Sequence, residues 1–291
     1  MREVQIFDFL KIMKKEYLEK LSNGQVYFSC CAKWRSAAKL YDNKGQGDKN
    51  EGVFAKYLRK NSRKPIQNYK KQFGKDLIVR TDGEYVLLSR KSSLYVPATC
   101  FYSIDSQSII NELPQNEEER ISKIAESTQD NEFRVDNVPL VIPNKFSDDF
   151  HWEKDDVEAI LIKSPKNFVK KLKDFGMFGN KITYIDMSKE YDIFAEKLYE
   201  KHYNLSLEAA KEKHIDIFFK DQKNYEHQYE YRIILPKKAL KSAKKGYTIK
   251  LHGLKKYVYK KGNKEVAPKD IDFICNTKNL RIKLCLIMEK R

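Results

Sequence analysis

A short charged segment stands immediately before an apolar run in the last third of the chain. It reads His227-Gln228-Tyr229-Glu230-Tyr231-Arg232 and leads into Ile233-Ile234-Leu235. On a strand, successive side chains point to opposite faces, so Gln228, Glu230 and Arg232 share one face. A carboxylate fixed between two hydrogen-bonding side chains can stabilise positive charge that develops in a transition state. A structural alternative is equally open, in which Glu230 forms an ion pair with an arginine across neighbouring strands.

A second candidate lies in a glycine-rich loop near the N-terminus. The loop reads Lys44-Gly45-Gln46-Gly47-Asp48-Lys49-Asn50-Glu51-Gly52. Its glycines permit sharp backbone turns around a ligand. Asp48 and Glu51 stand three residues apart, so they could cooperate, or one could bind a metal ion that the other orients. The loop is not a P-loop, which requires Gly-Lys-Ser/Thr after four intervening residues. The alternative is an exposed turn whose glycines serve only the backbone geometry.

Four blocks of the sequence resemble an uncharacterised family of bacterial and phage-borne proteins. The blocks are Asn23-Gly24-Gln25-Val26-Tyr27-Phe28-Ser29, Gly47-Asp48, Glu51-Gly52 and Glu230-Tyr231-Arg232. No activity follows from this resemblance. What it implies is a role in phage defence or as a toxin.

The spacing Gln228-x-Glu230 is also similar to the Gln/Glu-x-Glu pair of the ADP-ribosyltransferase superfamily. This resemblance implies NAD as the cofactor, with Glu230 stabilising the oxocarbenium ion as nicotinamide leaves and Gln228 orienting the acceptor. Arg232 would support both residues. The superfamily also has an early arginine or histidine, and because His151 is the first histidine here, the arginine form is the one implied.

The resemblance further implies a cofactor pocket made by residues of the first half. An arginine would hold an NAD phosphate, a serine or tyrosine would line the nicotinamide pocket, and the acidic loop would shape it. These residues are Tyr27, Ser29, Arg35, Asp48 and Glu51, with Arg2 as the alternative to Arg35.

The chain carries a large excess of positive charge. There are 57 Lys and Arg against 41 Asp and Glu, a net charge of +16. Such a field attracts nucleic acid or another anionic partner. Basic residues gather in two runs, 56–75 and 237–261, where tyrosines such as Tyr57 and Tyr69 could stack on unpaired bases. The residues expected to contact phosphates are Arg59, Lys60, Arg63, Lys64, Lys70, Lys71, Lys255 and Lys256.

Two other functions stay open beside ADP-ribosyl transfer to nucleic acid or protein. One is a nucleic-acid-binding protein or a Mg²⁺-dependent nuclease, in which Asp48 and Glu51 would join Glu230 around the metal. The other is a pure interaction protein whose charge docks an acidic partner. The five cysteines form no C-x-x-C pair, which argues against a zinc site or a disulfide framework.

Composition and periodicity predict one α+β domain over residues 1–291, with a mostly antiparallel central sheet, flanking helices and a possible surface insertion at 105–155. The resemblance implies that this sheet is ADP-ribosyltransferase-like. No apolar stretch approaches the roughly 18 residues that cross a bilayer, and the N-terminus lacks the features of a signal peptide. We therefore expect a cytoplasmic protein without membrane contact. The sequence leaves its oligomeric state open.

Hydrophobic spacing predicts the individual elements. Helices are expected at 9–21, 165–175, 191–203 and 206–213, with a short amphipathic stretch containing Trp34 and Leu40. Strands are expected at 25–30, 94–104, 182–185, 215–219, 229–235, 247–251, 257–259 and 280–288. Asp82-Gly83 should form the tight turn of a hairpin between 77–80 and 85–88.

Overall fold

The largest sheet is assembled from strands drawn from almost the whole length of the chain. In the computed structural model, which describes residues 6–41, 47–105, 108, 113–127, 132–133, 143–150, 156–163, 165–252, 258–261 and 275–276, this sheet has the order β15-β8-β1-β6-β13-β9. The strands are β1 (Ile6–Lys14), β6 (Ala98–Asp105), β8 (Val157–Lys163), β9 (Phe178–Lys181), β13 (Glu230–Ile234) and β15 (Val258–Lys261). Every neighbouring pair is antiparallel.

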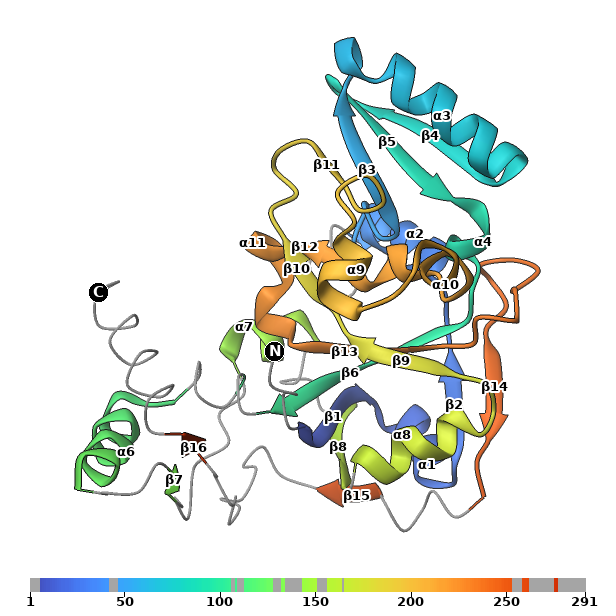
Figure 1. The fold of residues 1–291 in the computed structure, drawn as a ribbon. Helices are drawn as coiled ribbons and strands as arrows, with labels where there is room; N and C mark the ends of the chain where they lie inside the picture. The colour runs from blue at the N-terminus through green and yellow to red at the C-terminus, as the bar shows by residue number, and fades with distance from the viewer. Residues whose placement is uncertain are drawn as a thin grey trace.

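A second, four-stranded antiparallel sheet lies at the other end of the molecule (Figure 1). Its order is β11 (Tyr191–Asp192), β3 (Val53–Leu58), β5 (Tyr85–Arg90) and β4 (Leu77–Asp82). Gly83, with a φ of 57°, makes the turn of the β4–β5 hairpin, because this backbone conformation suits glycine. The basic segment η1 (Arg59–Asn61) and α3 (Arg63–Phe73) follows β3 and packs on this sheet through Ile66, Tyr69 and Phe73.

Smaller strand pairs and short helices fill the space between and beside these sheets. β2 (Gln25–Phe28) pairs antiparallel with β14 (Tyr247–Lys250), β10 (Thr183–Ile185) pairs parallel with β12 (Phe219–Asp221), and β7 (Glu132–Phe133) pairs with β16 (Cys275–Asn276). The helices are α1 (Lys15–Ser22), α2 (Cys31–Tyr41), α4 (Lys91–Leu94), α6 (Gln115–Ser127), α7 (Asn144–Asp149), α8 (Pro165–Lys173), α9 (Leu198–Tyr203), α10 (Leu207–Glu212) and α11 (Gln222–Tyr225). Shorter 3-10 turns are η2 (Gly74–Asp76), η3 (Ile215–Phe218) and η4 (Glu226–Gln228). No helix in this described part of the chain combines the length and apolarity needed to span a membrane.

Strand β13 has a different environment on each of its faces. Tyr231 and Ile233 point into an apolar core beneath α8, together with Phe9 and Phe168. Because side chains alternate along a strand, Glu230, Arg232 and Ile234 point the other way. Ile234 joins the core that includes the four-stranded sheet. The two charged residues of β13 therefore lie between the large sheet and the elements packed on it.

The predicted α+β class with a mostly antiparallel sheet is confirmed. The β4–β5 hairpin and the helix that begins at Pro165 also lie where the sequence places them. Three other predictions are wrong. Residues 9–14 belong to central strand β1, residues 191–192 to edge strand β11, and residues 215–218 to a 3-10 turn. Much of the 105–155 segment and all of 280–288 lie outside the described residues.

Candidate functional site

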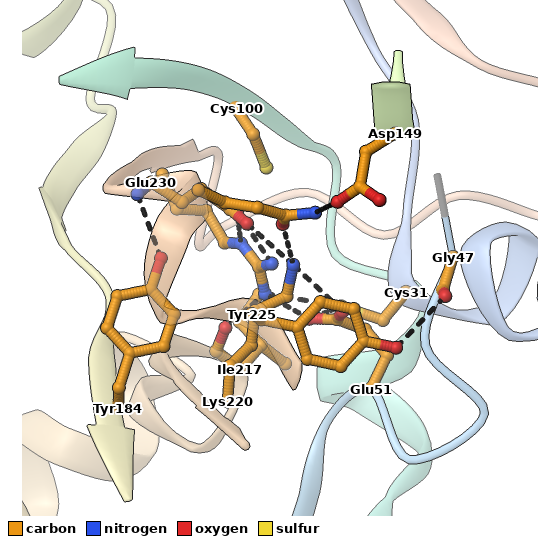
Figure 2. A network of polar contacts seen from close by, with 12 residues as sticks. Cys31, Gly47, Glu51, Cys100, Asp149, Tyr184, Ile217, Lys220, Tyr225 and Glu230 are labelled. Atoms are coloured by element: carbon orange, nitrogen blue, oxygen red, sulfur yellow. Dashed lines mark hydrogen bonds and ion pairs between the residues drawn. The ribbon is translucent and has the colours of Figure 1, made fainter. Parts of the chain in front are cut away.

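Four charged side chains form a buried network where β13 meets β12 and the loop before β3 (Figure 2). Arg232 bonds the carboxylate oxygens of Glu51 at 2.5 Å and of Glu230 at 2.7 Å. Lys220 lies 2.7 Å from Glu230 and 3.9 Å from Glu51. We call these four residues the charge network. It contains as many cations as carboxylates, and the exposed fraction of each side chain is 8% or less.

Each member of the charge network reaches it from a different local structure. Glu51 ends the turn that begins at Asp48, and Gly52 (φ of 68°) then directs the chain into β3. Lys220 is the central residue of the short strand β12. Glu230 and Arg232 share one face of β13, as their spacing predicts. Gln228, which was expected on the same strand, lies instead in the 3-10 turn η4.

Glu230 and Lys220 of the charge network are each kept ionised by the opposite charges beside them. Burial alone would raise the pKa of Glu230, but Arg232 and Lys220 outweigh it and hold that pKa far below its ordinary value. Burial likewise opposes the charge on Lys220, yet Glu230 and Glu51 raise its pKa above the ordinary value. Both oxygens of Glu230 accept hydrogen bonds, Oε1 from Arg232 and Oε2 from Lys220. Glu230 is therefore a fully paired carboxylate, and its ion pair with Arg232 lies within β13 and not, as the structural alternative expected, across neighbouring strands.

The network continues through Gln228 to a histidine–aspartate pair. Gln228 accepts a hydrogen bond from Lys220 at 3.1 Å and donates one to Asp149 at 3.0 Å. The same oxygen of Asp149 lies 2.7 Å from His227 Nε2, and the pKa of Asp149 is lowered by these contacts, although burial opposes the shift. Tyr229, between Gln228 and Glu230, has a φ of 38°, an uncommon conformation for a non-glycine residue. This turn lets both Gln228 and Glu230 face Lys220.

Residues of α2 cover the other side of Arg232. The guanidinium carbon lies 4.9 Å from the centroid of the Trp34 ring, and Nη1 also donates to the carbonyl oxygen of Ile217. The Cys31 sulfur lies 4.0 Å from the same nitrogen, and burial raises the pKa of this thiol well above its ordinary value. Cys31 is therefore a packed thiol, not an activated nucleophile.

Asp48 is a buried acid beside the network that has no ion pair within the described residues. Its exposed fraction is 5%, and its Oδ1 accepts a hydrogen bond from the Asn50 backbone at 2.7 Å. Burial, followed by the nearby Glu51, raises the pKa of Asp48 to about 6. Arg35 and Lys220 act in the opposite direction but do not cancel the shift. Asp48 is thus the acid of this region whose charge changes near neutral pH.

The described glycines of this loop pack closely against neighbouring parts of the protein. A Cβ at Gly47 would lie 2.5 Å from the backbone oxygen of Trp34, so only glycine lets the loop rest on α2. A Cβ at Gly52 would meet Leu94 at 3.1 Å, and the Gly52 φ of 68° itself favours glycine. Gly45 lies outside the described residues. The geometry of the described glycines is explained by packing without a ligand.

The structure brings some of the predicted cofactor residues together and leaves others apart. Arg35 donates to the backbone oxygen of Glu51 and, at 2.7 Å, to Ser89 Oγ, so it braces the acidic loop. Tyr27 is 47% exposed on the β2–β14 ribbon, and its hydroxyl accepts a hydrogen bond from Lys33, which is not a network residue. Ser29 bridges to Ala98, and its buried Oγ has no partner among the described residues. Arg2 lies outside the described residues.

Of the eight predicted phosphate-binding residues, the structure describes six. Arg59, Lys60, Arg63, Lys64, Lys70 and Lys71 are all exposed on η1 and α3. Lys255 and Lys256 lie outside the described residues. The neighbouring tyrosines are not available for stacking, because the hydroxyl groups of Tyr57 and Tyr69 both bond the buried Asp192.

Sequence reasoning missed Lys220 and Asp149. Lys220 carried a usable signal, since it is a cation directly after the apolar run 217–219, where a buried position requires a partner. Asp149 lies in a segment without comparable periodicity. Among the described residues, no three His, Cys, Asp or Glu side chains are grouped so that they could hold a metal ion, so the arrangement of Asp48, Glu51 and Glu230 gives no support to a Mg²⁺ site.

Comparisons with known proteins assign no relative to this chain: no family model, no curated protein and no solved structure matches it.

Proposed function

We propose that this protein binds nucleic acid by contacting the phosphate backbone with the exposed cations of η1 and α3. These cations, which we call the α3 basic face, are Arg59, Lys60, Arg63, Lys64, Lys70 and Lys71, together with Lys75 of the following turn η2. The stretch 56–75 contains no Asp or Glu. This one-sided charge on an ordered helix is the observation that carries the proposal.

Within the described part of the chain none of the cations of the α3 basic face forms an ion pair. The exposed Lys14 and Lys189, by contrast, each lie beside a carboxylate. The nearest acid along the chain, Asp76, accepts two hydrogen bonds from Ser92. Glu190, beside the start of η1, is bonded to Asn61 and the Leu58 backbone. The positive charge of this face is therefore not neutralised by these acids and is available to bind an anionic partner.

The apolar side of α3 fixes that face in place. Tyr69 and Phe73 stack with ring planes 4° apart, and Phe54 of β3 meets Tyr69 edge-on. A rigid row of cations suits a phosphate backbone, because each neutralised phosphate releases condensed counterions. Such contacts give affinity without base specificity. We expect binding that depends steeply on salt and weakly on sequence.

Fluorescence anisotropy with labelled single-stranded and duplex oligonucleotides, measured between 50 and 200 mM salt, tests the proposal directly. The variant Lys60→Glu/Lys64→Glu/Lys71→Glu should lose about tenfold or more in affinity and show a shallower dependence on salt. A matched control carries the same change in net charge at Lys14, Lys15 and Lys189, which already lie beside carboxylates. Equal losses in both variants, or no binding by the wild type, would contradict the proposal.

A second function, ADP-ribosyl transfer from NAD, has one observation in its favour. Gln228 and Glu230 both contact Lys220, and Arg232 joins them to Glu51, which lies far away in sequence. In this reaction the bond between nicotinamide and the ribose C1′ breaks, and C1′ bonds to a nucleophile of nucleic acid or protein. A carboxylate held ionised, as Glu230 is, would stabilise the cationic transition state. This function ranks second because Glu230 is 6% exposed and both of its oxygens are already paired.

Incubation with labelled NAD and cell extract tests this second function. Label on nucleic acid or protein should disappear in Glu230→Gln and persist in Glu226→Gln, an exposed glutamate of the same segment. No label with the wild-type protein would exclude the transfer. The phage-defence or toxin role, which rests on the resemblance to the uncharacterised family, would stay a prediction. Cleavage of RNA or DNA only after addition of Mg²⁺ would instead favour the nuclease alternative.

A further inference from the structure

The outward face of the β2–β14 ribbon presents an exposed aromatic ring. Val26 and Phe28 point inward and are buried, whereas Tyr27 between them is 47% exposed. Thr248 stands directly opposite Tyr27 in the register, and both Thr248 and Lys250 are exposed. A Cβ at Gly246 would overlap the Tyr27 ring, so this glycine allows the ring to lie against the backbone. The Tyr27 ring is thus exposed to solvent while the backbone at Gly246 supports it from one side.

Positive charge surrounds this ring without any acid in the adjoining segment. Lys33 Nζ lies 3.2 Å from the Tyr27 hydroxyl and 5.6 Å from the centroid of its ring. The stretch 237–250, which ends in β14, contains no Asp or Glu. Its exposed lysines are Lys237, Lys238, Lys241, Lys244, Lys245 and Lys250. Within the described residues none of these six forms an ion pair, and Lys238 Nζ lies over the Tyr247 ring at 3.7 Å.

A second exposed tyrosine of the protein offers a matched comparison. Tyr17 on α1 is 49% exposed, and Lys20 Nζ lies 5.4 Å from its ring centroid, close to the values for Tyr27 and Lys33. However, the same helix carries Glu16 and Glu19 beside Tyr17. These carboxylates repel a phosphate backbone. The two rings therefore have similar exposure and the same kind of cation nearby, but Tyr17 has carboxylates in its own segment and the segment 25–28 around Tyr27 has none.

We propose that Tyr27 is a stacking platform for the bases of single-stranded nucleic acid, with the lysines of 237–250 binding the adjacent phosphates. The inference rests on the proposed nucleic-acid binding and adds a second contact surface and a class of ligand. An aromatic ring beside a row of cations is the combination that unpaired strands require, because their bases have free faces and their phosphates are regularly spaced. Bases inside a duplex are already stacked on one another, so they cannot use the ring.

An acidic protein segment is the competing partner for such a surface. The carboxylates of such a segment would form ion pairs with the lysines, but they have no flat face to stack on the ring of Tyr27. The supported position of that ring on Gly246 therefore favours the nucleic acid, and the two partners differ in whether binding depends on Tyr27.

The test compares Tyr27→Leu with Tyr17→Leu in anisotropy titrations of an unstructured 20-nucleotide single strand and a duplex hairpin. Tyr27→Leu should weaken binding of the single strand about tenfold and leave duplex binding unchanged. Tyr17→Leu should change neither, and Tyr27→Trp should retain single-strand binding. If wild type binds but Tyr27→Leu binds the single strand equally well, the inference is overturned while the proposed function stands. If the wild type binds neither oligonucleotide, both fail.

Photocrosslinking of the wild-type protein decides the question even if Tyr27→Leu folds poorly. A single strand containing 5-iodouridine should crosslink to Tyr27, as mapped by mass spectrometry of the digested protein. Crosslinks found only on other aromatic residues, such as Tyr17, would overturn the inference. A polyglutamate peptide that binds as tightly as the single strand, with no loss in Tyr27→Leu, would overturn it in favour of an acidic protein partner.

Discussion

The charge network and the α3 basic face show two opposite ways of carrying charge. In the network, Arg232 and Lys220 are buried and each faces two carboxylates. On α3 the cations are exposed and none has a carboxylate among the described residues. A buried charge must be neutralised within the protein, because its desolvation is costly. An exposed surplus has no such need, so it is the surplus on α3, and not the larger cluster of ionic contacts, that indicates an external partner.

The largest expected effect is on the buried side. Arg232→Met should lower the free energy of unfolding by about 3–5 kcal/mol, because Glu51 and Glu230 would remain buried and, among the described residues, would keep only Lys220 as an ion-pair partner. Urea denaturation measures this change. Arg63→Met on α3 is the control and should alter stability by less than about 0.5 kcal/mol. A similarly small effect for Arg232→Met would show that the network does not stabilise the fold.

Asp48→Asn should have the next largest effect and should depend on pH. Because the pKa of Asp48 rises from 3.8 to about 6 on folding, the folded state holds its proton more tightly, and stability falls as pH increases from about 4 to about 6. Removing this carboxylate should therefore stabilise the protein at pH 7 by roughly 2–3 kcal/mol and have little effect near pH 4. Urea denaturation at pH 4, 5 and 7 measures the difference. Equal stabilisation at every pH would contradict this origin.

A smaller effect is expected from the tyrosines beside α3. Tyr69 donates to Asp192 at 2.8 Å, and the Tyr57 hydroxyl bonds the same carboxylate. Tyr69→Phe should reduce stability by about 1–2 kcal/mol, because the buried Asp192 loses a donor. Its affinity for oligonucleotides should equal that of the wild type. Weaker binding at unchanged stability would instead show that the Tyr69 hydroxyl itself contributes to nucleic-acid binding.

The smallest change in stability is expected on the α3 basic face itself. Reversing Lys60, Lys64 and Lys71 should change the free energy of unfolding by about 0.5 kcal/mol or less, since these exposed side chains have no internal partner to lose. Thermal melting of the triple variant beside the wild type checks this. A large destabilisation would mean that the face has a structural role, and it would weaken the contrast with the charge network.

The parts of the fold with strong local signals were predictable. Asp82-Gly83 produces the expected hairpin, and Pro165 is the first residue of α8, as predicted. The segment 9–21 misled because Phe9, Ile12, Met13 and Tyr17 fit helical spacing, yet Phe9 and Ile12 are fixed in β1 by pairing with β6 and β8. Tertiary pairing overrides periodicity there, and a single sequence does not contain that information.

The candidate site shows the same limit. The shared face of Glu230 and Arg232 follows from the two-residue period of a strand, but the meeting of Glu51 with Arg232 depends on packing between distant elements. Exposure is equally invisible in the sequence: Tyr57 and Tyr69 stand within a basic run, and only the fold shows that they point inward to Asp192. The net positive charge predicted an anionic partner. It could not predict which cations would form no ion pair with a carboxylate of the protein.

The strand order of the large sheet has a consequence for how the chain is made. Synthesis delivers β1 first and β6 and β8 later, so these three strands can pair early in the growing polypeptide. The second edge of β6 stays unpaired until β13, which begins at residue 230, has been synthesised. An uncovered edge beside apolar strands invites pairing with other molecules. Products that terminate before β13 should therefore aggregate, and the opposite edge, at β8, is covered only when β15 (Val258–Lys261) has also been made.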